Sequence, residues 1–405
     1  MSTALLARQP IYDANVKITA YELLFRSDDI NRANVIDGDS ATSDVILNAF
    51  TELPVDEILN YKPAYINFTR NLLDAPPLIN KQQLVIEILE DIVVDEDMIL
   101  AVTRLKDQGY VIALDDYVYD PAHHSLLQLA DIIKIDIMAV GIDGAQQQLK
   151  LLSQYNVTFL AEKVETQDDF RQCKALGFTA FQGYFLSKPE IIKGKKISAD
   201  QQSVLRLMAV LQDPKVDFDG ISRAISANPA LSFKLLRLVN SSFFNLRSTI
   251  DSITLAITML GLSKIRSWAG LLAMTNSVKK PEALAVNTMI RSRMAQLLGE
   301  ALEKMEFSTD RLFTAGLITS LDAYFDVSLE EILAVLSLPV DMQEVIMGDE
   351  GVPALLLDTA IQFERARLDK VDWQKLSAIG LSSKFVEESY IESVRWTDGY
   401  ISAIC

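Results

Sequence analysis

The first half of the chain repeats one pattern: a short run of β-branched or aromatic residues ends near a polar residue, and a helix-like stretch follows. The helix-like segments 95–108 and 167–176 carry apolar residues at three- and four-residue spacing. Successive polar markers are roughly 20 to 45 positions apart, which is enough for a strand, a helix and a return. There are seven such markers: Glu22, Asn67, Glu87, Asp115, Lys134, Glu162 and Gln182. The repetition predicts an α/β fold, a parallel barrel of the (β/α)8 type.

A barrel brings the carboxyl ends of all its strands to one mouth, where functional residues gather. An open doubly wound sheet is the alternative fold, but it does not bring all seven strand ends together. The alternation stops after Lys188-Pro189, and the short basic segment 191–198 is typical of a boundary. We therefore expect a first domain over residues 1–198.

Helical periodicity dominates from Ala199 onward, as in QQSVLRLMAVL and PALSFKLLRLV. Pro229 and Gly261 stand where a helix start and a helix stop are expected. The sequence predicts an all-α domain over residues 199–405.

Composition limits the chemistry that the chain can carry. A net charge of -17 over 405 residues argues against binding DNA or RNA through a broad basic surface. Two cysteines and an adjacent pair of histidines, His123 and His124, nearly exclude a zinc site and leave oxygen ligands. No apolar run is long enough for a bilayer, and the first nine residues lack the features of a signal peptide. We expect a cytoplasmic protein without a membrane segment.

Acidic residues accumulate at the predicted barrel mouth. Taken singly, each carboxylate is as consistent with helix capping or a lysine pair as with function. Together they repel one another, and little positive charge is nearby besides Arg26, Lys134 and Lys163. Bound divalent cations are the simplest way to offset this repulsion, and a site of oxygen ligands favours Mg²⁺ or Mn²⁺.

The adjacent carboxylates Asp115 and Asp116 need a particular backbone to act together. Neighbours on a strand point to opposite faces, so both can face one site only where the strand has ended. One could then bridge two cations and the other bind the second, an arrangement that suits displacement at phosphorus. Lys134 could orient or deprotonate a water, balance phosphate charge, or simply pair with Asp115 or Glu162.

These motifs, in this order, resemble the EAL phosphodiesterase family along nearly the whole first half: ELLFR (22–26), INFT, EILE, DDY, KID, AEKVE and QGYFLSKP. The resemblance implies hydrolysis of cyclic di-GMP to linear pGpG with two Mg²⁺ or Mn²⁺ ions. It implies metal ligands at Glu22, Asn67, Glu87, Asp115, Asp116 and Glu162. It also implies catalytic roles for Lys134, Glu162 and Gln182, substrate contacts from Arg26 and Glu22, and a supporting role for Glu165.

The sequence departs from that family at three places. Leu23 replaces an alanine, and Tyr117–Asp120 (YVYD) replaces a loop that normally reads Phe-Gly-Thr-Gly. Lys163 replaces a glycine. In the family the loop orders the second metal and a dimer contact, so the change bears on catalytic efficiency and on a homodimer.

The second half resembles the HDOD domain in SANPALSFKLLRLVNSSFF (226–244) and SITLAITMLGLSKIRSW (252–268). That fold is related to the HD phosphohydrolases, whose metal site needs histidine and aspartate. No histidine follows His124, and Thr319-Ser320 stands where the His-Asp step is expected. The resemblance implies a regulatory module, or one that binds a protein partner.

Two alternatives to an active phosphodiesterase remain open. The first is a catalytically silent signalling scaffold that binds cyclic di-GMP or a protein, favoured by the altered loop after Asp116. The second is an enolase-like barrel enzyme, which also combines carboxylates, Mg²⁺ and a lysine. The order of the KID, AEKVE and QGY motifs argues against the second.

Overall fold

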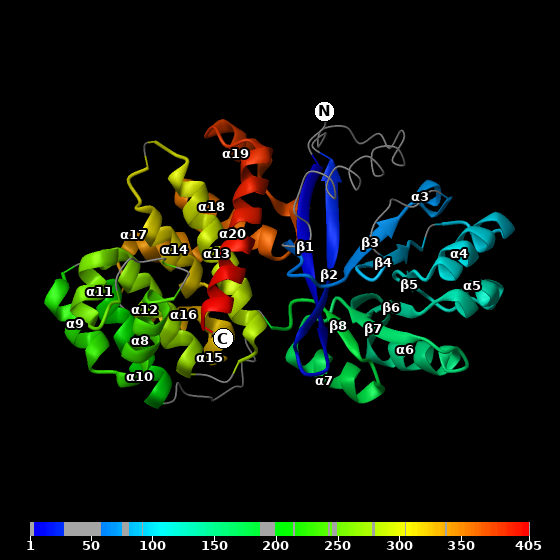
Figure 1. The fold of residues 1–405 in the computed structure, drawn as a ribbon, viewed down its shortest axis with the longest axis horizontal. Coiled ribbons are helices and arrows are strands. Elements are labelled where there is room, and N and C mark those ends of the chain that lie inside the picture. Colours follow the sequence, from blue (N-terminus) through cyan, green and yellow to red (C-terminus); the bar gives the residue numbers. More distant parts are fainter. Residues whose placement is uncertain are drawn as a thin grey trace. The chain divides into compact units, whose positions relative to one another are not determined.

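The first of two compact units, Met1–Leu186, is built around eight strands that close into one barrel (Figure 1). The computed structural model describes residues 4–27, 58–74, 81–90, 92–186, 199–213, 215–241, 244, 249–277, 280–303, 305–336 and 338–404. The strands are β1 (Ala4–Asp13), β2 (Ile18–Ser27), β3 (Ala64–Phe68), β4 (Leu84–Ile88), β5 (Val111–Leu114), β6 (Ile132–Asp136), β7 (Thr158–Glu162) and β8 (Ala180–Gln182). The helices are α3 (Arg70–Asp74), α4 (Glu96–Gln108), η1 (Pro121–His123), α5 (His124–Leu129), α6 (Ile137–Leu152) and α7 (Gln167–Leu176).

The barrel has the eight strands of the predicted (β/α)8 type, one more than the seven that the sequence pattern marks. That strand, β1, pairs antiparallel with both β2 and β8, whereas the strands from β2 to β8 pair in parallel. The four residues between β1 and β2 form a tight turn, in which the Asp13 carboxylate accepts hydrogen bonds from the backbone of Asn15 and Lys17. So short a link allows only a hairpin, because parallel strands need a long crossover. The predicted barrel is confirmed, with a hairpin in place of its first β–α unit.

Side chains that point into the barrel alternate with those that point out, as the two-residue period of a strand requires. The inward positions nearest the barrel floor are apolar and pack as one buried cluster: Ile11, Ala20, Tyr65, Val85, Ala113 and Leu160. Two residues further toward the mouth, the inward positions of the same strands are polar. The apolar cluster is therefore the floor of a polar site.

Gly183 follows β8 and lies against the connection between β7 and α7. It has a φ of +144°, and a Cβ there would lie 2.1 Å from the Val164 carbonyl oxygen. We expect Gly183→Ala to lower the free energy of unfolding by about 3 kcal/mol, since the backbone must move to relieve the clash. Gly177→Ala is the matched control: its φ is +106° with nothing within 4 Å, so it should cost only about 1 kcal/mol. Urea denaturation of both variants tests this, and equal losses would contradict it.

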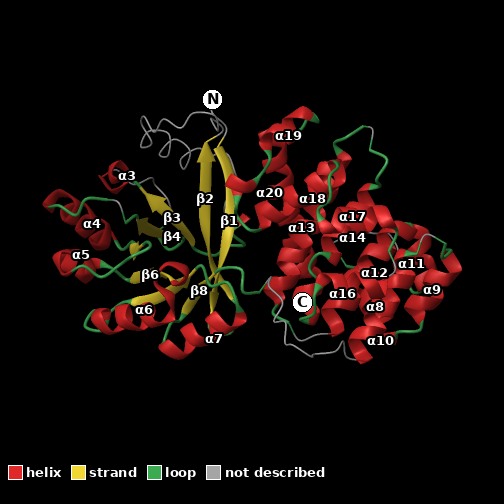
Figure 2. Ribbon diagram, turned by 180° about the vertical axis from the view of Figure 1, so that it is seen from behind, coloured by secondary structure: helices red, strands yellow, loops and turns green. Residues whose placement is uncertain are grey.

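The second unit, Ser187–Cys405, is all-α in the part that the structure describes, as predicted (Figure 2). Pro229 is the first residue of α10 and Gly261 follows α11, as expected. Its helices are α8 (Ala199–Gln212), α9 (Phe218–Ser226), α10 (Pro229–Val239), α11 (Ile253–Leu260), α12 (Leu262–Ser277), α13 (Glu282–Glu300), α14 (Thr309–Ile318), α15 (Leu321–Phe325), α16 (Leu329–Leu336), α17 (Val340–Met347), α18 (Val352–Glu364), η2 (Leu368–Lys370), α19 (Trp373–Ala378) and α20 (Ser383–Ile404). The predicted boundary after residue 198 lies outside the described residues and stays a prediction.

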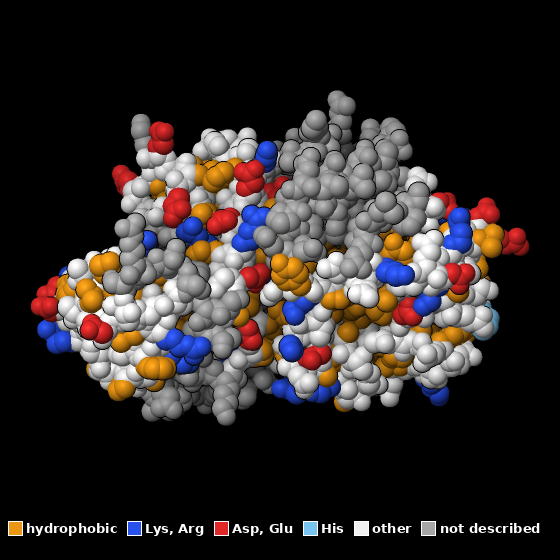
Figure 3. Space-filling view, in the orientation of Figure 1, with side chains coloured by type: hydrophobic (Ala, Val, Ile, Leu, Met, Phe, Trp, Pro, Cys, Tyr) orange, Lys and Arg blue, Asp and Glu red, His pale blue; other side chains and the backbone are white. Residues whose placement is uncertain are grey.

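None of the described helices is long and apolar enough to cross a membrane. On the face drawn in Figure 3, the Lys and Arg side chains that are coloured lie at several separate places among Asp and Glu. That face offers no continuous basic surface among its described residues.

Candidate active site

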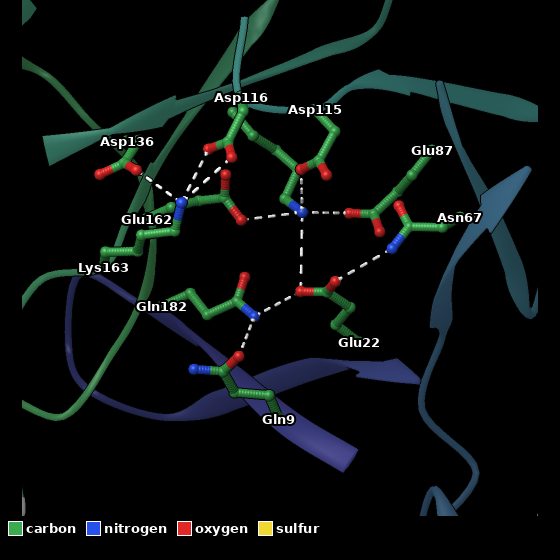
Figure 4. Close-up of polar contacts among 11 residues, drawn as sticks. Gln9, Glu22, Asn67, Glu87, Asp115, Asp116, Asp136, Glu162, Lys163 and Gln182 are labelled. Atoms are coloured by element: carbon green, nitrogen blue, oxygen red, sulfur yellow. Dashed lines mark hydrogen bonds and ion pairs between the residues drawn. The ribbon is translucent and has the colours of Figure 1, made fainter. Parts of the chain in front are cut away.

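Strands β2 to β8 each bring one polar side chain to the barrel mouth, at the strand's inward positions or directly after its end (Figure 4). Each lies two residues beyond an inward position in or against the floor, so the strand period alone turns it into the barrel. Asp115 follows β5, whose last residue is Leu114, and Glu162 and Gln182 end their strands. The structure thus brings together all seven predicted markers: Glu22, Asn67, Glu87, Asp115, Lys134, Glu162 and Gln182.

The ammonium group of Lys134 lies at the centre of these side chains and is fully buried. Its Nζ atom is 2.6 Å from both Glu87 Oε1 and Asp115 Oδ1 and 2.8 Å from Glu162 Oε1. Glu22 Oε2 is 3.6 Å away. One positive charge therefore faces four carboxylates in a place that water barely reaches.

Burial and mutual repulsion shift the proton affinities of these groups. Burial, the largest cause, raises the pKa of Glu162 to about 8; Lys134 opposes the shift and Asp115 adds to it. Burial likewise raises the pKa of Glu87, with further repulsion from Glu22 and Asp115. Burial alone would lower the pKa of Lys134, but the four carboxylates around it raise it above its usual range. Lys134 is therefore protonated at neutral pH.

The raised pKa of Glu162 predicts how stability depends on pH when no metal ion is bound. Between a pKa near 4.5 in the unfolded chain and about 8 in the folded one, the folded state binds more protons. The free energy of unfolding should therefore fall as pH rises from about 5 to about 8 in EDTA. Glu162→Gln removes this titration, so its stability should vary less over the same range. Urea denaturation at several pH values measures both slopes, and identical slopes would contradict the assignment.

Glu22 anchors a chain of side-chain amides. Its Oε2 atom accepts a 2.6 Å hydrogen bond from Gln182 Nε2, which also donates to Gln9 Oε1 at 2.9 Å. Asn67 Nδ2 donates to Glu22 Oε1 at 3.5 Å. The sequence pattern missed Gln9 because it missed strand β1. The sequence signal for Gln9 was its two-residue spacing from the apolar Ile11, which puts both on one face of a strand. Pairing in the hairpin places Gln9 opposite Glu22.

A second, more exposed cluster flanks the first. Lys163 Nζ lies 3.0 Å from Asp116 Oδ2 and 2.5 Å from Asp136 Oδ2. Asp136 was also missed, although it lies two residues after Lys134 on β6 and so shares its face. Asp116 has a φ of +42°, so the chain turns sharply after Asp115, and the two adjacent carboxylates face one region as predicted (Figure 4).

The segment Tyr117–Asp120 is held in place without glycine. Tyr117 is buried, and its backbone N–H donates to the Lys134 carbonyl at 3.0 Å. Asp120 caps η1 by accepting a hydrogen bond from the Ala122 backbone, and the Tyr119 N–H donates to Gln148 Oε1. The loop that departs from the family pattern therefore connects the end of β5 to α5 through specific hydrogen bonds.

Two other predicted residues are placed less fully. The backbone of Arg26 lies in β2, but its side chain is outside the described residues, so its contact with substrate stays a prediction. Glu165 is half-buried in the connection between β7 and α7, and its supporting role also stays a prediction.

Comparison with known proteins accounts for both units. The EAL domain model matches residues 48–189 and the HDOD domain model matches residues 197–328. The cyclic di-GMP phosphodiesterase CdgJ of Vibrio cholerae is 36% identical over 98% of this chain and 93% of its own length. The chain belongs to the EAL–HDOD family. The uncharacterized protein YuxH of Bacillus subtilis is 30% identical over 98% of this chain and 99% of its own. Among solved structures, the PaMucR phosphodiesterase in complex with c-di-GMP matches at 19% identity, a TM-score of 0.38, 46% of this chain and 96% of that one.

The oxygen atoms at the mouth of this EAL barrel fit a hard divalent cation. Several buried oxygens have no hydrogen-bond partner: Asn67 Oδ1, Glu87 Oε2, Glu162 Oε2 and Gln182 Oε1. Carboxylate and amide oxygens are the ligands that Mg²⁺ and Mn²⁺ prefer. Among the described residues no three carboxylates lie close enough together to hold a metal ion as they stand. The Lys134 ammonium lies between the carboxylates of Glu87 and Asp115. A cation would therefore compete with Lys134 for the same oxygens.

The HDOD unit carries a buried arginine beside Thr319 and Ser320. Arg291 is buried, and its guanidinium donates to Thr319 Oγ1 at 3.0 Å and Ser320 Oγ at 3.1 Å. The same group pairs with the buried carboxylate of Glu364 on α18. Thr319 and Ser320 are the residues that stand where the sequence comparison expects a His-Asp step, and a buried guanidinium bonds both of them.

Proposed function

We propose that this chain hydrolyses cyclic di-GMP to pGpG at the barrel mouth with divalent cations. The observation that carries the proposal is the ring of inward polar side chains, one each from β2 to β8, around the buried Lys134 ammonium. A site dense in carboxylates attracts a phosphodiester only when cations neutralise it. Membership of the EAL–HDOD family supports the substrate, since the relative CdgJ carries the name of a cyclic di-GMP phosphodiesterase.

In this proposal the cation is held by the amide oxygen of Asn67 and by the four carboxylates of the ring. These carboxylates are Glu22, Glu87, Asp115 and Glu162. The cation, Mg²⁺ or Mn²⁺, would stabilise charge on the phosphate and make a nearby water more acidic. Two cations are expected from the family resemblance, with Asp116 as a ligand of the second.

The side chains of the ring then have separate tasks. The carboxylates around Lys134 raise its pKa and keep it protonated, so it acts as a positive charge and hydrogen-bond donor toward the water or phosphate rather than as a base. Glu162 would hold the cation in its charged form, and it accepts a 2.8 Å hydrogen bond from the Lys134 ammonium. Gln182 fixes the orientation of Glu22 through its 2.6 Å hydrogen bond. Oxygen of the water bonds to phosphorus, the bond from phosphorus to one ribose O3′ breaks, and that oxygen leaves as a hydroxyl with a proton that the water supplies, which gives the linear dinucleotide.

Hydrolysis by the full chain is the decisive test. Purified protein with Mn²⁺ or Mg²⁺ should convert cyclic di-GMP to pGpG, as separated by chromatography, and EDTA should stop the reaction. Glu87→Gln protein serves as the inactive control. Absence of turnover with either cation, at a level no different from the control, would refute the proposal.

A silent signalling scaffold is the second candidate function. The observation in its favour is that Lys163 engages Asp116, a predicted metal ligand. This reading expects calorimetry to show binding of cyclic di-GMP that survives the Glu87→Gln substitution, together with no turnover. Turnover by the wild-type chain would exclude it.

The HDOD unit has a regulatory or partner-binding role in this proposal. Its support is the match to the HDOD domain model, together with the buried Arg291–Glu364 pair, whose guanidinium also bonds Thr319. Hydrolysis rates of the full chain and of residues 1–198 alone test the control of one unit by the other, and equal rates would argue for recruitment of a partner instead.

A further inference from the structure

Lys163 engages both oxygens of Asp116. Its Nζ atom lies 3.0 Å from Asp116 Oδ2 and 3.3 Å from Asp116 Oδ1, and it also lies 2.5 Å from Asp136 Oδ2 (Figure 4). An ammonium group donates up to three hydrogen bonds, so these two carboxylates can occupy it fully. Asp116 therefore already has a cation, supplied by the chain itself.

The backbone is bent to bring these two side chains together. Lys163 has a φ of +52° and Asp116 a φ of +42°, so both lie in the left-handed region that residues with a Cβ adopt rarely. They follow β7 and β5 at the same edge of the barrel. Glycine at position 163 would adopt this conformation without strain. The ion pairs of Lys163 with Asp116 and Asp136 offset the strain of its positive φ.

The inner part of the mouth, around Lys134, differs from the outer part, around Lys163, in whether its oxygens have hydrogen-bond partners. In the inner part, Glu87 Oε2, Glu162 Oε2 and Asn67 Oδ1 are buried and have no hydrogen-bond partner. In the outer part, both oxygens of Asp116 have Lys163 as a partner. A divalent ion on Asp116 would have to displace the ammonium and would then repel it from a few ångströms. In the inner part Lys134 pairs with one oxygen of each of Glu87, Asp115 and Glu162, but other oxygens there stay unpartnered and are open to a first cation. Asp116 has no oxygen without an ammonium partner, so a second cation is disfavoured there.

We propose that the Lys163 ammonium takes the place of a second divalent cation at Asp116, so that the resting site binds one divalent ion tightly. The proposal rests on the proposed function only in assuming that the inner carboxylates hold such an ion. It revises the expectation of two ions to one ion and one tethered ammonium.

Counting bound Mn²⁺ tests the proposal without substrate. Apo full-length chain is titrated with Mn²⁺, and free Mn²⁺ is measured by electron paramagnetic resonance. The wild-type chain should bind one equivalent tightly, and Lys163→Gly should bind a second with at least tenfold higher affinity than wild type. Lys163→Arg keeps the charge and should bind one. Lys163→Gln keeps most of the side chain without the charge and should behave as the glycine variant does.

Two controls locate the effect. Adding Asp116→Asn to Lys163→Gly should remove the second Mn²⁺ and leave the first. Asn60→Gly relieves another positive φ, +48°, away from the site and should leave the wild-type count. Equal counts and affinities for wild type, Lys163→Gly and Lys163→Gln would overturn the proposal, whatever the rate of hydrolysis. Failure to hydrolyse cyclic di-GMP with the predicted counts would overturn the proposed function instead.

Discussion

Replacing Lys134 with methionine should lower the rate of cyclic di-GMP hydrolysis roughly 1000-fold and destabilise the metal-free chain by about 3–5 kcal/mol. The ammonium is fully buried and lies within 2.8 Å of the carboxylates of Glu87, Asp115 and Glu162. Methionine fills similar space but leaves these buried carboxyl groups without the ammonium that bonds to all three of them. Initial rates and urea denaturation in EDTA measure the two effects.

Adding a divalent cation to the Lys134→Met variant should separate its loss of stability from its loss of hydrolysis rate. Mn²⁺ replaces the missing charge at the carboxylates, so it should restore most of the stability while the hydrolysis rate stays low. Lys106→Met is the matched control, because Lys106 pairs with Asp131 at 2.6 Å with both side chains about one-third exposed. An exposed pair contributes at most about 1 kcal/mol, and the control should hydrolyse normally. Equal losses in both variants would show that the central ammonium has no special role.

Local signals made much of the barrel predictable from the sequence. The helix expected over 167–176 is found as α7 with the same bounds, because Thr166 and Asp169 form a capping box at its start. Its end is set by Gly177 in a left-handed conformation. The seven inward residues were equally predictable from the sequence, since alternate residues of a strand point to one face.

The features that the sequence pattern missed depend on pairing between strands and on backbone turns. Strand β1 was missed because its run contains Arg8, Gln9 and Pro10, and only pairing with β2 and β8 fixes it as a strand. The contact between Lys163 and Asp116 requires positive φ angles at both residues, which sequence periodicity does not encode. The sequence identifies which residues face the mouth, and only the structure shows which cation each carboxylate contacts.

Replacing Glu87 with glutamine should leave the stability of the metal-free chain unchanged or higher, yet lower hydrolysis about 1000-fold. Glu87 is completely buried, and burial raises its pKa, so the charged form is costly in the folded state. Glutamine is nearly isosteric and neutral, and its amide oxygen is still able to accept a hydrogen bond from Lys134. The variant loses one anionic ligand for a divalent cation, so Mn²⁺ should bind more weakly. Denaturation in EDTA, Mn²⁺ titration and initial rates measure the three effects.

Glu364→Gln in the HDOD unit is the matched control, since it makes the same substitution at another buried carboxylate. Glu364 pairs with the guanidinium of Arg291, and both side chains are almost fully buried. Neutralising it leaves a buried cation poorly compensated, so we expect a loss of about 2–3 kcal/mol in stability with hydrolysis per folded molecule unchanged. The two variants should thus move in opposite directions: one keeps stability and loses activity, and the other loses stability and keeps activity. If Glu87→Gln instead unfolds the chain, or retains wild-type turnover, then Glu87 is a structural residue of the barrel and the cation is held elsewhere.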